Sequence, residues 1–107
     1  MLTQDDVDAA LDEQRLNWSR QGDMLVTTVT LHDFAAALQF VNAVGAAAEA
    51  ANHHPDIDIR WNTVRLALTT HDSGGITLLD LALAGAIDRM RPDVREDDRS
   101  GGEVAET

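Results

Sequence analysis

Apolar residues recur every three or four positions in three stretches of the chain, a spacing typical of helices that bury one face. These stretches are residues 3–13, 33–51 and roughly 78–90. Alanine, the strongest helix former, fills much of the second stretch. We expect three helices, and the apolar series of the longest one is Phe34, Leu38, Val41 and Val44.

Two of the expected helices begin with the same pair of polar residues. Thr3 is followed three positions later by Asp6, and Thr77 by Asp80. A threonine at the N-cap with an acid at the third helical position forms a capping box, which satisfies free backbone N–H groups at the helix start. Asp80 is therefore expected to stabilise the last helix, whether or not it also has a role in a functional site.

Two hairpins are expected between the helices. Residues 18–20 and 24–31 flank the turn Gln21-Gly22-Asp23, and the second arm is rich in Val and Thr. Residues 56–61 alternate strictly, which predicts a half-buried strand with Trp61 in the core. The following apolar residues alternate on the opposite parity, so we place a tight turn at Asn62-Thr63. The two apolar series are Ile57, Ile59 and Trp61, then Val64, Leu66 and Leu68.

The expected order of elements is therefore α-β-β-α-β-β-α. Such an order predicts an α+β fold, a two-layer sandwich in which a four-stranded antiparallel sheet carries the helices on one face. Residues 1–90 form the expected domain. Residues 91–107 are acidic and lack a periodic apolar face, so we expect them to be a disordered tail.

Composition narrows the classes of function. The net charge is −11, and all eight basic residues are arginine. Nucleic acids and anionic membranes both need a concentrated cationic surface, so we expect neither as a partner. The chain has no cysteine, no visible signal peptide and no apolar run near the length of a membrane span, so we expect a cytoplasmic protein.

Three of the four histidines, His53, His54 and His71, fall within nineteen positions around the second hairpin. Imidazole has an unperturbed pKa of about 6.5, so such a group suggests either proton transfer near neutral pH or metal binding. The fourth, His32, precedes a helix and is expected to be a surface or capping residue.

The residues next to His53 and His54 indicate how these two side chains are arranged. Pro55 favours an extended His54, and neighbouring side chains in extended chain point to opposite sides. His53 and His54 should therefore have different tasks, and a zinc site shared by the three histidines is disfavoured. Asn52 occupies the position where a left-handed residue would end the long helix, and Glu49 is placed either to face solvent or to orient a histidine.

Several short motifs resemble those of one enzyme family, the pterin-4a-carbinolamine dehydratases, over residues 3–90. They are Glu49-x-x-x-His53-His54-Pro55, Trp61-Asn62, Thr70-His71, Gly75-Ile76-Thr77 and Asp80, with Asp33-Phe34-x-x-Ala37-x-x-Phe40 and Trp18 upstream.

The resemblance implies an enzyme that dehydrates 4a-hydroxytetrahydropterin to quinonoid dihydropterin, after an aromatic amino acid hydroxylase has used the cofactor. It implies His53, His54 and His71 as active-site histidines and Asp80 as a supporting acid. Glu49 and Asn52 are further candidates for supporting or substrate-binding residues. It also implies no metal, no cofactor besides the pterin substrate, and a homodimer or homotetramer.

The reaction removes hydroxide from C4a and a proton from N5, so one general acid and one general base suffice. The negative end of the long helix lies beside His53. We therefore hypothesise that His53 protonates the leaving hydroxyl or holds the substrate, with His54 and His71 as candidates for the base.

Three alternatives keep the same fold. The protein could act in another pterin pathway, such as molybdopterin metabolism, or bind pterin without turnover. It could also be a protein-partner module, like the mammalian family members that bind a transcription factor as dimerisation cofactors.

Overall fold

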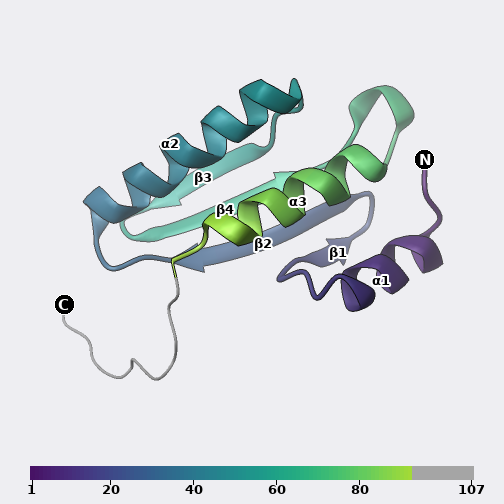
Figure 1. Cartoon of the computed structure of the whole chain (residues 1–107), viewed down its shortest axis with the longest axis horizontal. Coiled ribbons are helices and arrows are strands. Elements are labelled where there is room, and N and C mark those ends of the chain that lie inside the picture. Colours follow the sequence, from purple (N-terminus) through teal and green to yellow (C-terminus); the bar gives the residue numbers. More distant parts are fainter. Residues whose placement is uncertain (93–107) are drawn as a thin grey trace.

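The computed structural model describes residues 1–92, which form three α-helices, four strands and one 3-10 turn (Figure 1). Their order confirms the predicted α-β-β-α-β-β-α arrangement. The bounds are α1 Gln4–Glu13, β1 Ser19–Gln21, β2 Met24–Thr30, α2 Phe34–Ala51, β3 Asp56–Arg60, β4 Thr63–Leu68, η1 His71–Ser73 and α3 Leu78–Met90.

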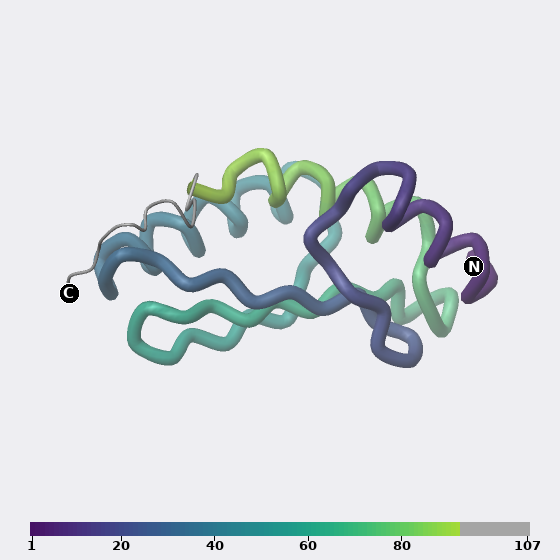
Figure 2. Tube along the Cα trace, turned by 90° about the horizontal axis from the view of Figure 1, so that it is seen from below, coloured from purple at the N-terminus to yellow at the C-terminus, as the bar shows by residue number. Residues whose placement is uncertain are grey.

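The four strands form one antiparallel sheet in the order β1-β2-β4-β3. Helices α2 and α3 lie over one face of this sheet, as Figure 2 shows, and α1 lies beside the short β1. The predicted two-layer α+β sandwich is therefore confirmed. The end of α2, the loop after β4 and the start of α3 meet at one end of the sheet (Figure 1), which positions the candidate site.

Both predicted capping boxes are present. In α1, the Thr3 hydroxyl accepts a hydrogen bond from the Asp6 N–H at 3.0 Å, and Asp6 Oδ2 accepts one from the Thr3 N–H at 3.3 Å. Thr77 and Asp80 repeat the arrangement at the start of α3. The two boxes differ in their surroundings, because Asp6 is exposed whereas Asp80 is fully buried.

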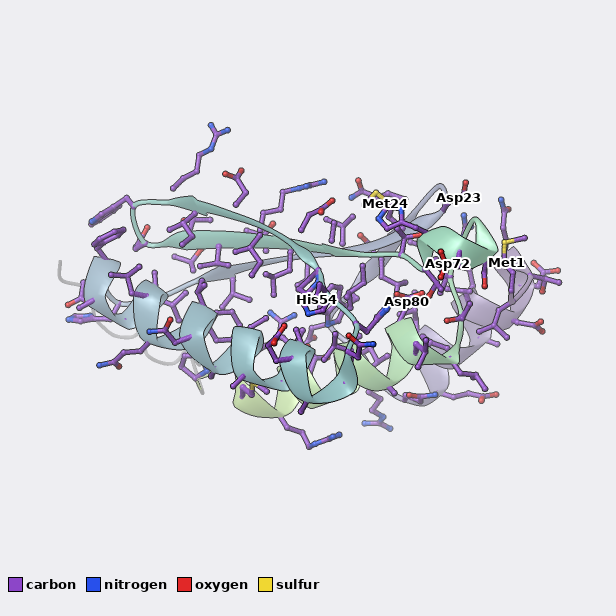
Figure 3. The ribbon with its side chains drawn as sticks, turned by 90° about the horizontal axis from the view of Figure 1, so that it is seen from above. Met1, Asp23, Met24, His54, Asp72 and Asp80 are labelled. Atoms are coloured by element: carbon purple, nitrogen blue, oxygen red, sulfur yellow. The ribbon has the colours of Figure 1, made fainter. Side chains whose placement is uncertain are left out.

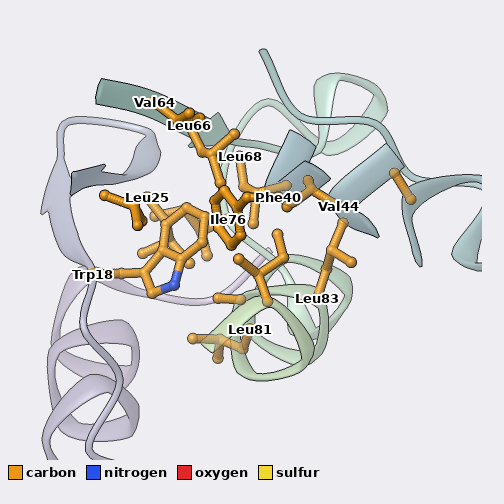
Figure 4. Close-up of a cluster of buried hydrophobic side chains, with 14 of the residues drawn as sticks. Trp18, Leu25, Phe40, Val44, Val64, Leu66, Leu68, Ile76, Leu81 and Leu83 are labelled. Atoms are coloured by element: carbon orange, nitrogen blue, oxygen red, sulfur yellow. The ribbon is translucent and has the colours of Figure 1, made fainter. Parts of the chain in front are cut away.

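The hydrophobic core lies between the sheet and the helices (Figure 4). The expected buried face of α2 was wrong in part: Phe34 and Leu38 are 48% and 41% exposed. The buried residues of α2 are Ala37, Phe40, Val44 and Ala48. This series also has a spacing of three and four, so periodicity could not choose between the two faces, and the alanines permit close approach to the neighbouring elements.

The turn of the second hairpin lies one residue earlier than predicted. Arg60 pairs with Thr63, so the loop is Trp61 and Asn62. Trp61 has a φ of 54° and is 66% exposed, so its predicted place in the core was wrong. A two-residue hairpin loop favours positive φ values, and a residue in that conformation leaves the alternation of the strand. The earlier turn pairs Ile59 with Val64, which places both apolar series on one face.

Helix α2 is the one helix among residues 1–92 that is long and apolar enough, by these two criteria alone, to cross a membrane. A helix that packs one face into a protein core meets the same criteria. Phe40 and Val44 place α2 in the core.

The predicted domain boundary after residue 90 falls next to a packed side chain. Arg91 Nε donates a hydrogen bond to Asp88 Oδ1 at 2.7 Å, and Arg91 also donates to the Asn17 carbonyl oxygen at 3.1 Å. The remainder of the predicted tail, residues 93–107, lies outside the described residues.

An exposed ion pair between α1 and β1 gives a pH-dependent prediction. Arg20 donates to Asp8 at 2.9 and 3.2 Å, and this hydrogen bond lowers the pKa of Asp8 from 3.8. A carboxylate with a lowered pKa stabilises the fold above its unfolded-state pKa, and this contribution disappears as the pH falls through the lower folded-state value. Asp8→Asn should therefore lower stability at neutral pH but not in strong acid.

Urea unfolding at both pH values measures this difference, with Asp12→Asn on the same helix as the control. Asp12 makes no side-chain hydrogen bond to the described residues. An Asp8→Asn deficit that persists in strong acid would contradict the prediction.

Candidate active site

The end of α2 fixes the start of the histidine pair. Asn52 is left-handed, with φ 50° and ψ 43°, as the sequence predicts. The His53 N–H donates to the Ala48 carbonyl oxygen at 3.0 Å, and the Asn52 N–H donates to that of Glu49 at 3.1 Å. These are the two hydrogen bonds of a Schellman motif, which ends a helix and redirects the chain. Asn52 thus supports the site through its backbone.

The two histidines then diverge, as predicted. His53 turns toward α3, where its Nε2 lies 2.5 Å from Asp80 Oδ1. The His53 side chain is 11% exposed and that of Asp80 is fully buried. A short, nearly buried contact between imidazole and carboxylate holds the ring in one orientation and fixes which nitrogen faces the acid.

Asp80 joins three segments of the chain at this point. Its Oδ2 accepts hydrogen bonds from the Thr70 hydroxyl at 2.7 Å and from the Thr77 N–H at 2.9 Å, while Oδ1 faces His53. The capping residue is therefore also the partner of a candidate catalytic histidine. The sequence left these two roles as alternatives, and in the folded chain one carboxylate has both contacts.

His54 occupies a different environment. Its Nε2 lies 2.6 Å from Glu49 Oε2, and the two side chains are 55% and 79% exposed. Figure 3 shows His54 and Asp80 in the same region between the sheet and the helices. Glu49 therefore contacts a histidine, and that histidine is His54. It is not His53, which follows Glu49 by the helical spacing of four residues. An exposed pair of this kind adds little stability, so its contribution would be to orient the ring.

His71 is not joined to the others by hydrogen bonds. It opens η1, it is exposed, and its side chain makes no hydrogen bond within residues 1–92. The preceding Thr70 belongs to the Asp80 network, and its backbone pairs with Gly75. Sequence reasoning assigned no role to Thr70, although its position before His71 could have suggested one.

Two hollows of the surface lie away from these histidines. One, of about 510 Å³, is lined by residues of β2 and the end of α3, among them Thr28, Asp88 and Arg91. Another, of about 230 Å³, lies between the N-terminus and the first hairpin. We place the candidate site at the histidines because two histidine–carboxylate pairs lie next to each other there.

The described residues contain no cluster of three or more His, Asp or Glu side chains arranged to hold a metal ion. Imidazole and carboxylate groups are the side chains that most often transfer protons in enzymes. Fold and site together define a small α+β protein that carries two histidine–carboxylate pairs at one end of its sheet.

Comparison with known proteins identifies the family. The model of the family "Pterin 4 alpha carbinolamine dehydratase" matches residues 1–90. The chain therefore belongs to the pterin-4a-carbinolamine dehydratase family, as its motifs predicted.

Individual relatives agree with this assignment. A Chloroflexus aurantiacus protein named "Putative pterin-4-alpha-carbinolamine dehydratase" is 58% identical over 77 residues, covering 72% of this chain and 83% of its own. A protein of the same name from Mycobacterium bovis is 48% identical over 90 residues, covering 84% and 95%.

Two solved structures resemble this one. The Brucella melitensis "transcriptional coactivator/pterin dehydratase" has a TM-score of 0.79 at 26% identity, with 85% of this chain and 98% of that chain covered. A pterin dehydratase-like protein described as a RuBisCO assembly factor of the alpha-carboxysome has a TM-score of 0.60 at 24% identity, with 72% and 92% covered. This second likeness extends to the fold alone.

Proposed function

We propose that the protein is a dehydratase that converts 4a-hydroxytetrahydropterin to quinonoid dihydropterin and water. The C4a–O bond breaks, the N5–H proton leaves, and a C4a=N5 double bond forms. The N5 lone pair drives the departure of the hydroxyl, so the protein has to supply one proton and remove another.

The observation that carries this proposal is the His53–Asp80 contact of 2.5 Å, with the His54–Glu49 contact of 2.6 Å on the next residue. Two imidazoles, each held by a carboxylate and turned in different directions, can act on two positions of one planar ring. We assign His53 to the leaving hydroxyl, because its ring is held by a fully buried acid. His54 and His71 are the candidates for the base at N5.

The test is the rate of quinonoid dihydropterin formation from freshly generated 4a-hydroxytetrahydropterin, with and without the purified protein. General acid and base catalysis each contribute about 10²- to 10⁴-fold, so the protein should accelerate the reaction by at least the smaller factor. A folded protein without any acceleration would refute dehydratase activity and favour pterin binding, another pterin substrate or a protein partner.

The proposal places the protein in the cytosol, after a hydroxylase that releases the 4a-hydroxypterin. It also includes self-association through β3, an edge strand of the sheet. An edge strand presents unpaired N–H and C=O groups. A second copy, antiparallel and centred on Ile59, would place Asp58 opposite Arg60 twice, so the strand is complementary in charge to itself.

Sedimentation at micromolar concentration tests this association. The wild-type protein should be a dimer or a multiple of it, and Arg60→Glu should be monomeric because acids would then face each other across the interface. Arg89→Glu, on the exposed side of α3 and away from the sheet edge, is the matched control. A monomeric wild-type protein, or an Arg60→Glu dimer, would contradict the prediction.

A further inference from the structure

The directions of the hydrogen bonds around Asp80 follow from one chemical fact. An ionised carboxylate has acceptors and no donor. The Thr77 N–H and the Thr70 hydroxyl both donate to Oδ2, at 2.9 and 2.7 Å. If Asp80 is ionised, its remaining partner, His53 Nε2, carries the proton between them and donates it to Oδ1.

The same reasoning fixes the next hydrogen bond in the chain. Thr70 has a single hydroxyl proton, which it donates to Asp80. The Thr70 and Thr77 hydroxyl oxygens are 2.8 Å apart, so Thr77 must donate to Thr70. Thr77 in turn accepts a hydrogen bond from the Leu79 N–H at 3.2 Å. The hydroxyl of Thr77 thus donates to Thr70, and the hydroxyl of Thr70 donates to Asp80.

Thr70 is also held firmly by its backbone. Its N–H donates to the Gly75 carbonyl oxygen at 2.9 Å, and its carbonyl oxygen accepts from the Gly75 N–H at 3.4 Å. These bonds close the loop that carries His71. Thr70 therefore holds the carboxylate from a fixed point, at the oxygen that His53 does not contact.

From this geometry we propose that Thr70 is a positioning residue, which acts through Asp80 to fix His53 in the tautomer protonated on Nε2. The Nε2 proton stays in the bond to Asp80, and the proton that His53 gives or takes moves at Nδ1. Nδ1 is the reacting nitrogen in both protonation states of the ring: the imidazolium donates its proton from Nδ1, and the neutral imidazole accepts a proton there. The catalytic part of the inference rests on the proposed dehydratase function, whereas the tautomer does not.

Nitrogen NMR of the histidine rings tests the tautomer directly, because protonated and unprotonated ring nitrogens differ widely in ¹⁵N shift. Spectra of the full chain are recorded over a pH series up to the neutral form of His53, and His53→Gln identifies its signals. Wild type should show protonated Nε2 and unprotonated Nδ1. In Thr70→Val the two tautomers should mix, because a carboxylate held by one donor fewer at Oδ2 can rotate and break its contact with His53.

Two variants separate positioning from a general loss of stability. Thr70→Ser keeps the hydroxyl and should restore the wild-type tautomer. Thr69→Val is the matched control, because the neighbouring Thr69 hydroxyl donates to the Asp23 carbonyl oxygen at 2.7 Å and is not among the hydrogen-bond partners of Asp80 in the described residues. Thr69→Val should leave the His53 spectrum unchanged.

Kinetics provide the second measurement. Loss of a residue that orients a metal-bound histidine costs about 10- to 100-fold in activity, and we expect a similar factor for a residue that orients His53. Thr70→Val should lower kcat by about this factor with little change in KM, since the interaction acts on the reacting group rather than on substrate affinity. Thr70→Ser should recover most of the rate.

The two measurements also distinguish this inference from the proposed function. A His53 protonated on Nδ1 in the wild type, or unchanged tautomers in Thr70→Val, would overturn the inference even if the protein is an active dehydratase. The expected tautomers in a protein without dehydratase activity would support the positioning role and refute the proposed function.

Discussion

His53→Ala is expected to reduce the dehydratase rate by about 10²- to 10⁴-fold, the usual contribution of one general acid or base. The loss should appear in kcat, because proton transfer to the leaving hydroxyl is needed in the transition state rather than for binding. The protein should stay folded, since the His53 side chain is 11% exposed and Asp80 keeps its hydrogen bonds from Thr70 and Thr77. The measurement is quinonoid dihydropterin formation at saturating substrate.

Two other histidine variants give this experiment its controls. His32→Ala removes an exposed histidine at the start of α2 and should leave the rate unchanged. His54→Ala should also lower the rate if His54 is the base at N5. The pH–rate profile should then lose its alkaline limb in His53→Ala, which lacks the acid, and its acid limb in His54→Ala, which lacks the base. Full activity in His53→Ala, with an unaltered pH profile, would refute the assignment of His53.

The second large effect is expected at Asp80, where stability and activity depend on the same carboxylate. Asp80→Ala leaves His53, the Thr70 hydroxyl and the Thr77 N–H without their common acceptor in a buried position. An unpaired buried polar group costs about 1–3 kcal/mol, so we expect a loss of about 3 kcal/mol in the free energy of unfolding. Urea unfolding measures it.

The matched control is the same position of the other capping box. Asp6→Ala removes the third residue of the α1 box, where the groups left behind are exposed and can bind water. Its cost should be about 1 kcal/mol or less. Equal losses in Asp80→Ala and Asp6→Ala would show that Asp80 is an ordinary capping residue.

Asp80→Asn separates the two roles of this carboxylate. The amide oxygen can still accept from Thr77 and Thr70, so the helix start should survive. The amide nitrogen would then face His53 and donate to Nε2, which forces the ring into the opposite tautomer. We expect a folded protein that has lost about 10²-fold or more of its rate. A fully active Asp80→Asn would contradict an orienting role.

Much of this protein could be predicted from local pattern. The order of elements, both capping boxes, the left-handed Asn52 and the divergence of His53 from His54 all depend on residues within a few positions of one another. Propensity, cap chemistry and the restriction before proline act over that range. The family motif was visible for the same reason, because most of its residues fall in two short segments.

The errors of prediction came where several local solutions were equally good. Helix α2 has two apolar series with the same spacing, and contact with the sheet and α3 selected the one that contains Phe40. The hairpin turn moved by one residue, which carried Trp61 out of the core. A shift of one residue costs little locally, but it decides which face of the sheet every later side chain occupies.

The sequence by itself determined the elements, their order, the helix caps and the three histidines as candidates for acid–base chemistry. Tertiary structure alone decided which groups meet: His53 with Asp80, 27 residues away, and Thr70 with the same carboxylate. No local rule brings such residues together, because their contact depends on how α3 packs against the end of α2 and the loop after β4. Burial of Asp80 at that junction turns a helix cap into the partner of a histidine.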